Sequence, residues 1–269
     1  MDLGLEGKTA LVTGAARGIG LATARAFAEE GCSLLLWDID ARVHSVALHL
    51  SEEFEVSIQS QVVDLVAFEP TQLEFEAFLH RGGTIQHVVH CAAMGSGKFG
   101  FPFTNLQPGD WPRTLEVNVL GMVNLAHLLT PHLVAQAEGT FVFLASVAGQ
   151  IGSQTDPPYS ASKAANINFS QCMAKDLAQH GIRVNTVCPG MVQTDLNQSV
   201  WKAWLSQVAE SEAMSYQEWA EKKIESVVPL KRWQSCEDVA SMVVFLSSQR
   251  ACQVTGQTIN VDGGFVMHC

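Results

Sequence analysis

Seven short apolar runs alternate with longer segments of helical periodicity along almost the whole chain. They lie at residues 9–13, 33–37, 56–63, 85–91, 140–145, 182–188 and 257–261. Nearly all of their residues are apolar, whereas a strand with one face in water alternates apolar and polar residues. Strands that are buried on both faces and separated by helices indicate a parallel sheet with right-handed crossovers. We therefore expect a doubly wound α/β fold, a seven-stranded parallel sheet with helices on both faces.

Very little interrupts this alternation. The 269 residues contain no internal repeat, low-complexity tract or linker rich in Pro, Gly and Ser. Only the stretch from 194 to about 228 lacks a strand, and it is amphipathic, with Trp201, Trp204 and Trp219. We expect a single domain over 1–269 with a helical substrate lid at about 194–228. The alternative is a surface excursion whose tryptophans pack on the body, because aromatic residues at helical spacing usually belong to a core.

The charge balance excludes several classes of partner. Sixteen Lys and Arg stand against 27 Asp and Glu, a formal net charge of −11 at pH 7. Such a surface repels phosphate, so nucleic acid and anionic membranes are poor partners. No apolar stretch approaches the roughly 18 residues of a membrane span, and the first residues lack the pattern of a secretory signal. We expect a cytoplasmic protein with no membrane partner.

The seven cysteines are scattered, and no Cys-x-x-Cys pair suggests zinc or a redox dithiol. His90 also has no second ligand at the spacing that a metal site needs. We predict no bound metal and a reducing compartment.

A glycine-rich turn follows the first predicted strand. Gly14, Gly18 and Gly20 stand between that strand and a helical run at 21–30. Glycines allow positive φ and let the backbone approach a pyrophosphate, whose charge then meets the N–H groups at the helix start. The pattern predicts a dinucleotide site, and its alternative is a tight turn with no ligand.

The second predicted strand ends at Asp38, eighteen positions beyond Gly20. A carboxylate at about this separation binds the adenosine ribose hydroxyls and repels a 2′-phosphate. Asp38 therefore predicts NAD(H), with NADP(H) the lesser alternative. Arg17 in the glycine turn is the opposing signal, since a guanidinium there could reach a 2′-phosphate. Asp38 could instead be only a surface cap.

Tyr159 and Lys163 are four residues apart in a segment that begins at Pro157 and Pro158. Proline suits the first turn of a helix, and residues four apart lie on one helical face. The two side chains can therefore project into the same site. The alternative is an incidental surface pair.

The chain resembles the short-chain dehydrogenase/reductase family, in its single-domain branch of about 250 residues, over nearly its whole length. The matching pieces are Thr13-Gly14-x-x-x-Gly18-x-Gly20, Asn118 in Val-Asn-Val-Leu-Gly, Ser146, Tyr159-x-x-x-Lys163, Pro189-Gly190 followed by Thr194, and Asn260-Val-Asp262-Gly263-Gly264. The resemblance implies a Rossmann-like form of the doubly wound fold.

The resemblance also implies a mechanism. Hydride passes between nicotinamide and a carbinol or carbonyl carbon while Tyr159 moves the proton on oxygen. A free phenol has a pKa near 10, and the Lys163 ammonium is expected to favour the phenolate. In the family this lysine also binds the nicotinamide ribose, a serine at the position of Ser146 orients the substrate oxygen, and Asn118 would hold a water that links the lysine to solvent.

Further positions are implied to bind the cofactor or the substrate. Asp64 is expected to accept from the adenine amino group, with a helix cap as its alternative, and Thr194 to contact the carboxamide. The implied cofactor-binding set is Gly14, Arg17, Gly18, Ile19, Gly20, Asp38, Asp64, Leu65, Ala92, Tyr159, Lys163, Pro189, Gly190, Val192 and Thr194. The candidate substrate-binding set is Ser146, Gln150, Tyr159, Met191 and Trp201.

One stretch departs from the family pattern. Where the family has Asn-Asn-Ala-Gly after the fourth strand, this chain reads His90-Cys91-Ala92-Ala93. The change replaces two polar side chains that join neighbouring strands and adds a Cβ where the backbone passes the cofactor. We expect cofactor binding to survive, because much of that contact is made by the main chain.

These features predict an NAD(P)-dependent oxidoreductase acting on a secondary alcohol or ketone, with NAD(H) preferred. A 3-ketoacyl-thioester reductase of the same family is an alternative, and a non-catalytic NAD(H) sensor is an alternative of another class. The family pairs its subunits through segments that correspond here to 112–133 and 159–179, which predicts a homotetramer or a homodimer. Their apolar residues could equally face the home sheet.

Overall fold

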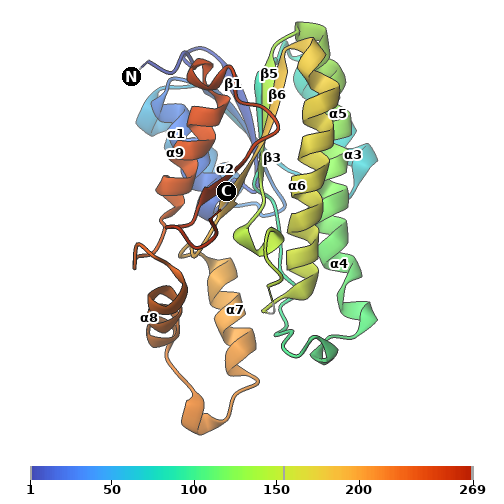
Figure 1. Cartoon of the computed structure of the whole chain (residues 1–269). Coiled ribbons are helices and arrows are strands. Elements are labelled where there is room, and N and C mark those ends of the chain that lie inside the picture. Colours follow the sequence, from blue (N-terminus) through green and yellow to red (C-terminus); the bar gives the residue numbers. More distant parts are fainter. Residues whose placement is uncertain (1, 154, 268–269) are drawn as a thin grey trace.

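Seven strands form one parallel sheet in the order β3-β2-β1-β4-β5-β6-β7 (Figure 1). The computed structural model describes residues 2–153 and 155–267. The strands are β1 Thr9–Thr13, β2 Ser33–Asp38, β3 Ile58–Val62, β4 His87–His90, β5 Gly139–Leu144, β6 Ile182–Pro189 and β7 Thr258–Val261. The predicted sheet is confirmed, although β3 and β4 are shorter than their apolar runs.

Helices cover both faces of the sheet (Figure 1). They are α1 Gly18–Glu29, α2 Val43–Phe54, α3 Phe68–His80, α4 Pro112–Leu115, α5 Gly121–Gln136, α6 Pro157–Leu177, α7 Asp195–Leu205, α8 Tyr216–Val227 and α9 Cys236–Ser247. One core lies between the sheet and α1, α2 and α9, with Phe27, Leu50 and Val243 fully buried or nearly so. The other lies beneath α3, α5 and α6 and includes Phe75 and Leu129.

The strand order reverses direction between β1 and β4. From β1 the chain moves outward to β2 and β3, and then returns to place β4 on the other side of β1. In doubly wound sheets the crevice at such a reversal, outside the carboxyl ends of the strands, is where ligands bind. The fold therefore directs attention to the residues that follow β1, β4 and β5.

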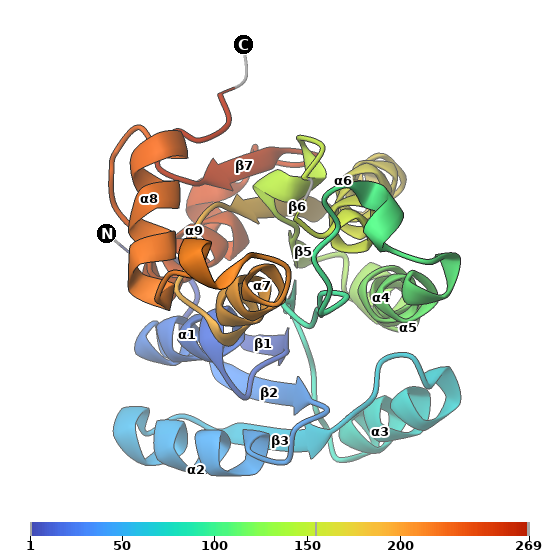
Figure 2. The same cartoon turned by 90° about the horizontal axis from the view of Figure 1, so that it is seen from below.

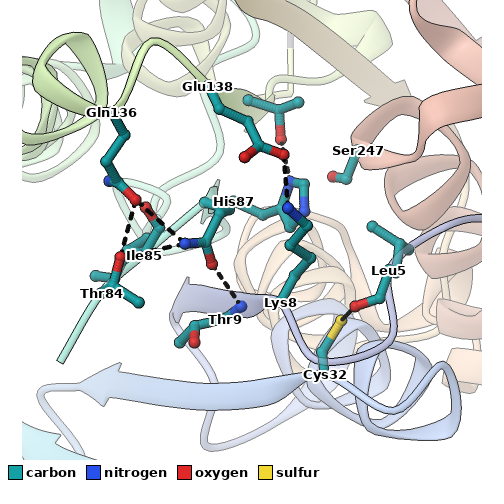
Figure 3. Close-up of polar contacts among 12 residues, drawn as sticks. Leu5, Lys8, Thr9, Cys32, Thr84, Ile85, His87, Gln136, Glu138 and Ser247 are labelled. Carbon is teal, nitrogen blue, oxygen red and sulfur yellow. Dashed lines mark hydrogen bonds and ion pairs between the residues drawn. The ribbon is translucent and has the colours of Figure 1, made fainter.

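The opposite end of the sheet is closed by its own polar contacts (Figure 3). Lys8 donates to Glu138 at 2.7 Å, and the Nδ1 atom of His87 lies 2.9 Å from the Thr140 hydroxyl. The main-chain N–H of Thr9 donates to the Gln86 side chain at 2.9 Å. The bonds of Thr9 and His87 join neighbouring strands at their amino ends, and the pair Lys8–Glu138 links the start of β1 to the start of β5 across β4.

One helical run corrects an expectation from the sequence. Among the described residues, Pro108–Gln136 is long and apolar enough to cross a membrane by length and composition alone, with a mean hydropathy of 1.3. In the fold, this run contains α4 and α5, and its side chains Met122, Leu125 and Leu133 are buried in the core under the sheet. Packing on the sheet accounts for part of its apolar character, since 39% of the apolar window is buried.

The segment 194–228, which we call the lid segment, contains α7 and α8 and extends beyond the body of the protein (Figure 1). Its aromatic residues pack on one another. Trp201 meets Tyr216 edge-on at 5.8 Å between ring centroids, and Trp204 lies 6.3 Å from Trp219. Seen from that end, α7 lies in front of the sheet near its middle (Figure 2). The predicted helices are present.

Candidate active site

Two glycines of this turn, Gly14 and Gly20, are packed too tightly to carry a side chain. Gly14 has φ +67°, and a Cβ there would lie 2.8 Å from the main-chain nitrogen of Ala92. A Cβ at Gly20 would lie 2.0 Å from the Gly14 oxygen. These contacts hold the start of α1 between the ends of β1 and β4. Among the described residues, no acidic side chain lies in the first turn of α1 and none caps it, so its N–H groups suit a phosphate.

Asp38 lies beside this turn, as predicted. One carboxylate oxygen accepts from the Ala16 N–H at 2.9 Å and the other from the Asp40 N–H at 2.9 Å. Each oxygen keeps a lone pair for a ribose hydroxyl. Arg17 is directed elsewhere, because it donates to Asp195 at the start of α7 at 2.9 Å. Both side chains of that pair are exposed.

Tyr159 and Lys163 face one another on the first turns of α6. The helix begins at Pro157, in agreement with the prediction, and Asp156 is its N-cap. Nζ of Lys163 lies 5.5 Å from the centroid of the Tyr159 ring. It donates to the main-chain oxygen of Leu144, the last residue of β5, at 2.6 Å. The predicted pair therefore lies at the carboxyl end of the sheet.

Ser146 completes this cluster from β5. It caps the short turn Val147–Gly149, where the Ala148 N–H donates to its hydroxyl at 3.1 Å. Burial raises the pKa of the Tyr159 phenol, the Ser146 hydroxyl lowers it, and the charge of Asp156 raises it further. Burial dominates, so the expected acidification by Lys163 is not seen in the protein alone.

Lys163 is only 2% exposed. Burial lowers the pKa of its ammonium group to about 8. The group therefore still carries its proton at neutral pH. The protein thus holds a buried positive charge against a buried phenol, which is the arrangement that a proton transfer at this phenol needs.

Asn118 is fully buried in a π-helical turn, Glu116–Leu120, between α4 and α5. Its Oδ1 accepts from the Met94 N–H at 2.8 Å, and its amide group donates to the Met94 oxygen at 2.8 Å and to the Ser162 hydroxyl at 2.9 Å. Both amide hydrogens are used. Asn118 therefore joins the loop after β4 to α6, and any relay water must rely on another group of this turn.

The departure His90-Cys91-Ala92-Ala93 keeps the strands joined. His90 Nδ1 lies 2.9 Å from the Thr13 hydroxyl, which also accepts from the Ala92 N–H at 3.3 Å. Burial, together with the charge of Lys163, lowers the pKa of His90 to about 3, so the ring is neutral. Ala93 is exposed and its φ is not positive. The added methyl strains no backbone there, and the described residues contain no cluster suited to a metal.

Other implied cofactor positions line the same edge. Asp64 receives the Val66 N–H at 3.0 Å, a turn-capping role that leaves one oxygen free. Thr194 caps α7 and lies over the glycine turn, because a Cβ at Gly18 would be 3.8 Å from its methyl. A Cβ at Gly190 would lie 2.8 Å from Asp262. Three of the implied cofactor positions mainly pack in or against the hydrophobic cores: Ile19, Leu65 and Val192. Ala92 and Pro189 lie just after β4 and at the end of β6.

The candidate substrate residues make contacts in different parts of the structure. Gln150 lies four residues after Ser146 and donates to the Asn260 side chain at 2.7 Å. Met191 is buried against Ile224 and Val228. Trp201 donates to the Met214 oxygen at 3.1 Å, so its contacts lie within the lid segment.

Sequence reasoning missed several residues that build the site. Asp156 contacts Tyr159, and Ser162 and the loop 94–96 both contact Asn118. An acidic residue directly before Pro-Pro is a helix-start signal and could have identified Asp156. Nothing in the sequence pattern indicates the other two.

Known proteins share this architecture. A family model described as enoyl-(acyl carrier protein) reductase matches residues 14–266. The 3-oxoacyl-[acyl-carrier-protein] reductase of Thermotoga maritima is 31% identical over 263 residues, 98% of this chain and 99% of the relative.

Solved structures agree. The L-sorbose reductase of Gluconobacter frateurii, complexed with NADPH and L-sorbose, superposes with a TM-score of 0.90 at 30% identity over 100% of both chains. An NAD⁺-bound xylitol dehydrogenase gives 0.88 at 28% identity, over 97% of this chain and 99% of its own. This protein is therefore a nicotinamide-dependent oxidoreductase of alcohols and ketones, and it belongs to the short-chain dehydrogenase/reductase family.

Proposed function

We propose that Tyr159 is the general acid and base of the reaction, assisted by Ser146 and Lys163. The observation that carries the proposal is the convergence of these three residues from β5 and α6 at the carboxyl edge of the sheet, beside the glycine turn. A bound nicotinamide supplies or accepts the hydride. The tight glycine turn and the open first turn of α1 fit its pyrophosphate.

Each side chain has a separate task in the direction of reduction. The Ser146 hydroxyl orients the carbonyl oxygen of the substrate. Tyr159 gives its phenolic proton to that oxygen as the carbon receives hydride, and the buried Lys163 charge stabilises the phenolate that remains. In the direction of oxidation, the phenolate takes the hydroxyl proton. The residues of the lid segment limit the access of water.

The preferred cofactor is NAD(H). Asp38 places a carboxylate next to the glycine turn, where it favours ribose hydroxyls and opposes a 2′-phosphate. Arg17, the one opposing signal in this turn, is paired with Asp195. Relatives use both forms, so the ratio of kcat/KM with NADH and NADPH decides the matter. A preference for NADPH in the wild type overturns the assignment, and Asp38→Ser is expected to move the ratio toward NADPH.

The substrate is an uncharged alcohol or ketone of the polyol class. The candidate residues Gln150, Met191 and Trp201 carry no charge, so none of them offers the bidentate guanidinium that binds a carboxylate. The structural relatives named above act on L-sorbose and xylitol. A panel of polyols with NAD⁺ and of ketoses with NADH, followed by NADH absorbance, tests this directly.

A second candidate substrate is a 3-oxoacyl thioester. The observation in its favour is the identity to the Thermotoga reductase. Against it, the net charge of −11 opposes docking of a strongly acidic carrier protein. Acetoacetyl thioester belongs in the same panel, and a higher kcat/KM for it than for every polyol and ketose would select this candidate.

We also propose a cytoplasmic homotetramer or homodimer. On the helices expected to pair, Leu120 is 52% exposed, whereas Met173 is 6% exposed and belongs to the home core. Only part of the apolar surface predicted for pairing is therefore available. Light scattering that returns a monomer near 29 kDa would remove the proposal.

A further inference from the structure

Asp156 is a buried carboxylate at the start of α6, three residues before Tyr159. Its exposed fraction is 7%. One oxygen accepts from the Tyr159 N–H at 3.2 Å, and its main-chain oxygen accepts from the Ser160 N–H at 2.9 Å. The residue therefore fixes the first turn of the helix that carries the phenol.

The other carboxylate oxygen of Asp156 binds the loop that follows β4. It accepts from the Ser96 N–H at 2.8 Å. The loop runs so close that a Cβ at Gly95 would lie 2.8 Å from this oxygen and 3.4 Å from Leu196 of α7. Asn118 holds the same loop through both main-chain groups of Met94. Two side chains from different helices thus clamp residues 94–96.

A helix cap alone does not require a buried charge. Serine or threonine caps a helix about as well as aspartate, and a buried carboxylate is unfavourable unless it is paired. Among the described residues, no lysine or arginine forms an ion pair with Asp156. Its hydrogen-bond partners are Ser96 and the Tyr159 N–H; burial raises the pKa of the carboxyl group, and the bonds from these partners oppose that rise. The cap alone therefore does not select aspartate at this position.

We propose that Asp156 is a positioning residue of the reaction, which holds the loop 94–96 against the Tyr159 turn and keeps a negative charge beside the phenol. The proposal rests on the proposed role of Tyr159. The loop follows directly from Ala92, where the backbone passes the glycine turn. Asp156 thus sets the position of the cofactor side of the site relative to its proton donor.

The negative charge of Asp156 changes the pKa of the Tyr159 phenol in one direction only. The groups that face Tyr159 are Ser146, Asp156, Cys188 and Lys163. Burial raises the pKa of Tyr159 most, the Ser146 hydroxyl lowers it, and the Asp156 charge raises it by a smaller amount. Removal of the charge therefore lowers the pKa of the phenol. The pH at which oxidation becomes fast, which requires phenolate, then falls as well.

The chain contains only two tyrosines. In a Tyr216→Phe background, Tyr159 is the sole phenol. Its ionisation is followed by ultraviolet difference absorbance in the complex with NAD⁺, whose positive ring favours the phenolate, because burial keeps the phenol of the protein alone protonated over the pH range in which the protein stays folded. Asp156→Asn removes the charge and keeps the size and the cap. Asp156→Ser is the second variant, which caps the helix if the first fails to fold. Asp176→Asn, exposed near the other end of α6, makes the same charge change as a control.

We expect both Asp156 variants to shift the phenol titration and the rising limb of kcat/KM for oxidation toward lower pH by the same amount. Loss of the charged bond to Ser96 lowers kcat/KM for NAD⁺ roughly tenfold. The control should move neither. A titration that stays in place overturns the proposal, including the case in which activity falls, since a merely structural cap gives that result. Failure of the proposed function is distinguished by Tyr159→Phe, which would then retain activity.

Discussion

The substitution Lys163→Met exchanges a buried charge for an apolar side chain of similar length. Burial lowers the pKa of Lys163 to about 8 from an ordinary value of 10.5, which corresponds to about 3 kcal/mol of folding free energy. The unfolded chain binds this proton more tightly than the folded chain. The penalty is therefore complete below pH 8 and disappears as the pH rises from 8 to 10.5.

The variant also loses one hydrogen bond. The Leu144 oxygen no longer receives the Lys163 ammonium, a loss of about 1 kcal/mol. Lys163→Met should therefore be more stable than the wild type by about 2 kcal/mol at pH 7. Above pH 10 it should be slightly less stable, because only the lost bond remains.

Urea denaturation followed by tryptophan fluorescence, at pH 7 and pH 10 and at one protein concentration, measures this difference. His90, whose pKa of about 3 is lowered by burial and by the charge of Lys163, stays neutral in the folded protein between pH 7 and pH 10. The pH dependence of the stability difference in this range therefore belongs to Lys163. Lys175→Met replaces an exposed lysine of the same helix. Its difference from the wild type in free energy of unfolding should be the same at pH 7 and at pH 10. A stability difference for Lys163→Met that does not change with pH refutes the reasoning. The stabilised variant is expected to be inactive, which is a common relation between stability and function at active sites.

Three further outcomes are expected. Tyr159→Phe should lower kcat at least a hundredfold, the usual share of general acid catalysis, while NADH fluorescence still reports binding; unaltered turnover would remove Tyr159 from the mechanism. Gly14→Ala should raise the NADH dissociation constant and lower stability by about 1 to 3 kcal/mol in thermal unfolding, because its φ is +67° and its Cβ would meet Ala92; an unchanged protein contradicts the close packing. Ala93→Gly should leave the NADH dissociation constant unaltered, since the methyl is exposed, and tighter binding would show that it obstructs the cofactor.

The sheet and its ligand edge could be predicted because the strands β1, β2, β4, β5 and β6 are rich in apolar residues and buried over most of their residues, whereas the edge strands β3 and β7 are only partly buried. Apolar runs such as 182–188 define strands regardless of their partners, and the spacing of Gly14 and Gly20 reflects a local turn. The Tyr159–Lys163 pair was predictable because residues four apart lie on the same face of a helix, whatever the rest of the fold.

The remaining parts of the site depend on contacts between distant segments. The bond between Asp156 and Ser96 joins residues 60 apart, and no local pattern announces it. The role of Asn118 was expected to involve water, but Met94 and Ser162 use both hydrogens of its side chain. Lys163 and oxidised nicotinamide were expected to lower the pKa of Tyr159. In the protein without cofactor, burial in the completed core raises this pKa, and the Ser146 hydroxyl is the group that lowers it.

The reversal of strand order at β1 has a consequence for assembly. The residues at the ligand edge come from β1, β4, β5 and β6, and the chain must complete five crossovers before β6 takes its place beside β5. Such long-range pairing slows folding, because the chain loses the entropy of closing a long loop before the stabilising contacts between the strands form. A nascent or truncated chain that ends before β6 is thus expected to be inert toward nicotinamide and prone to self-association through the unpaired edge of β5.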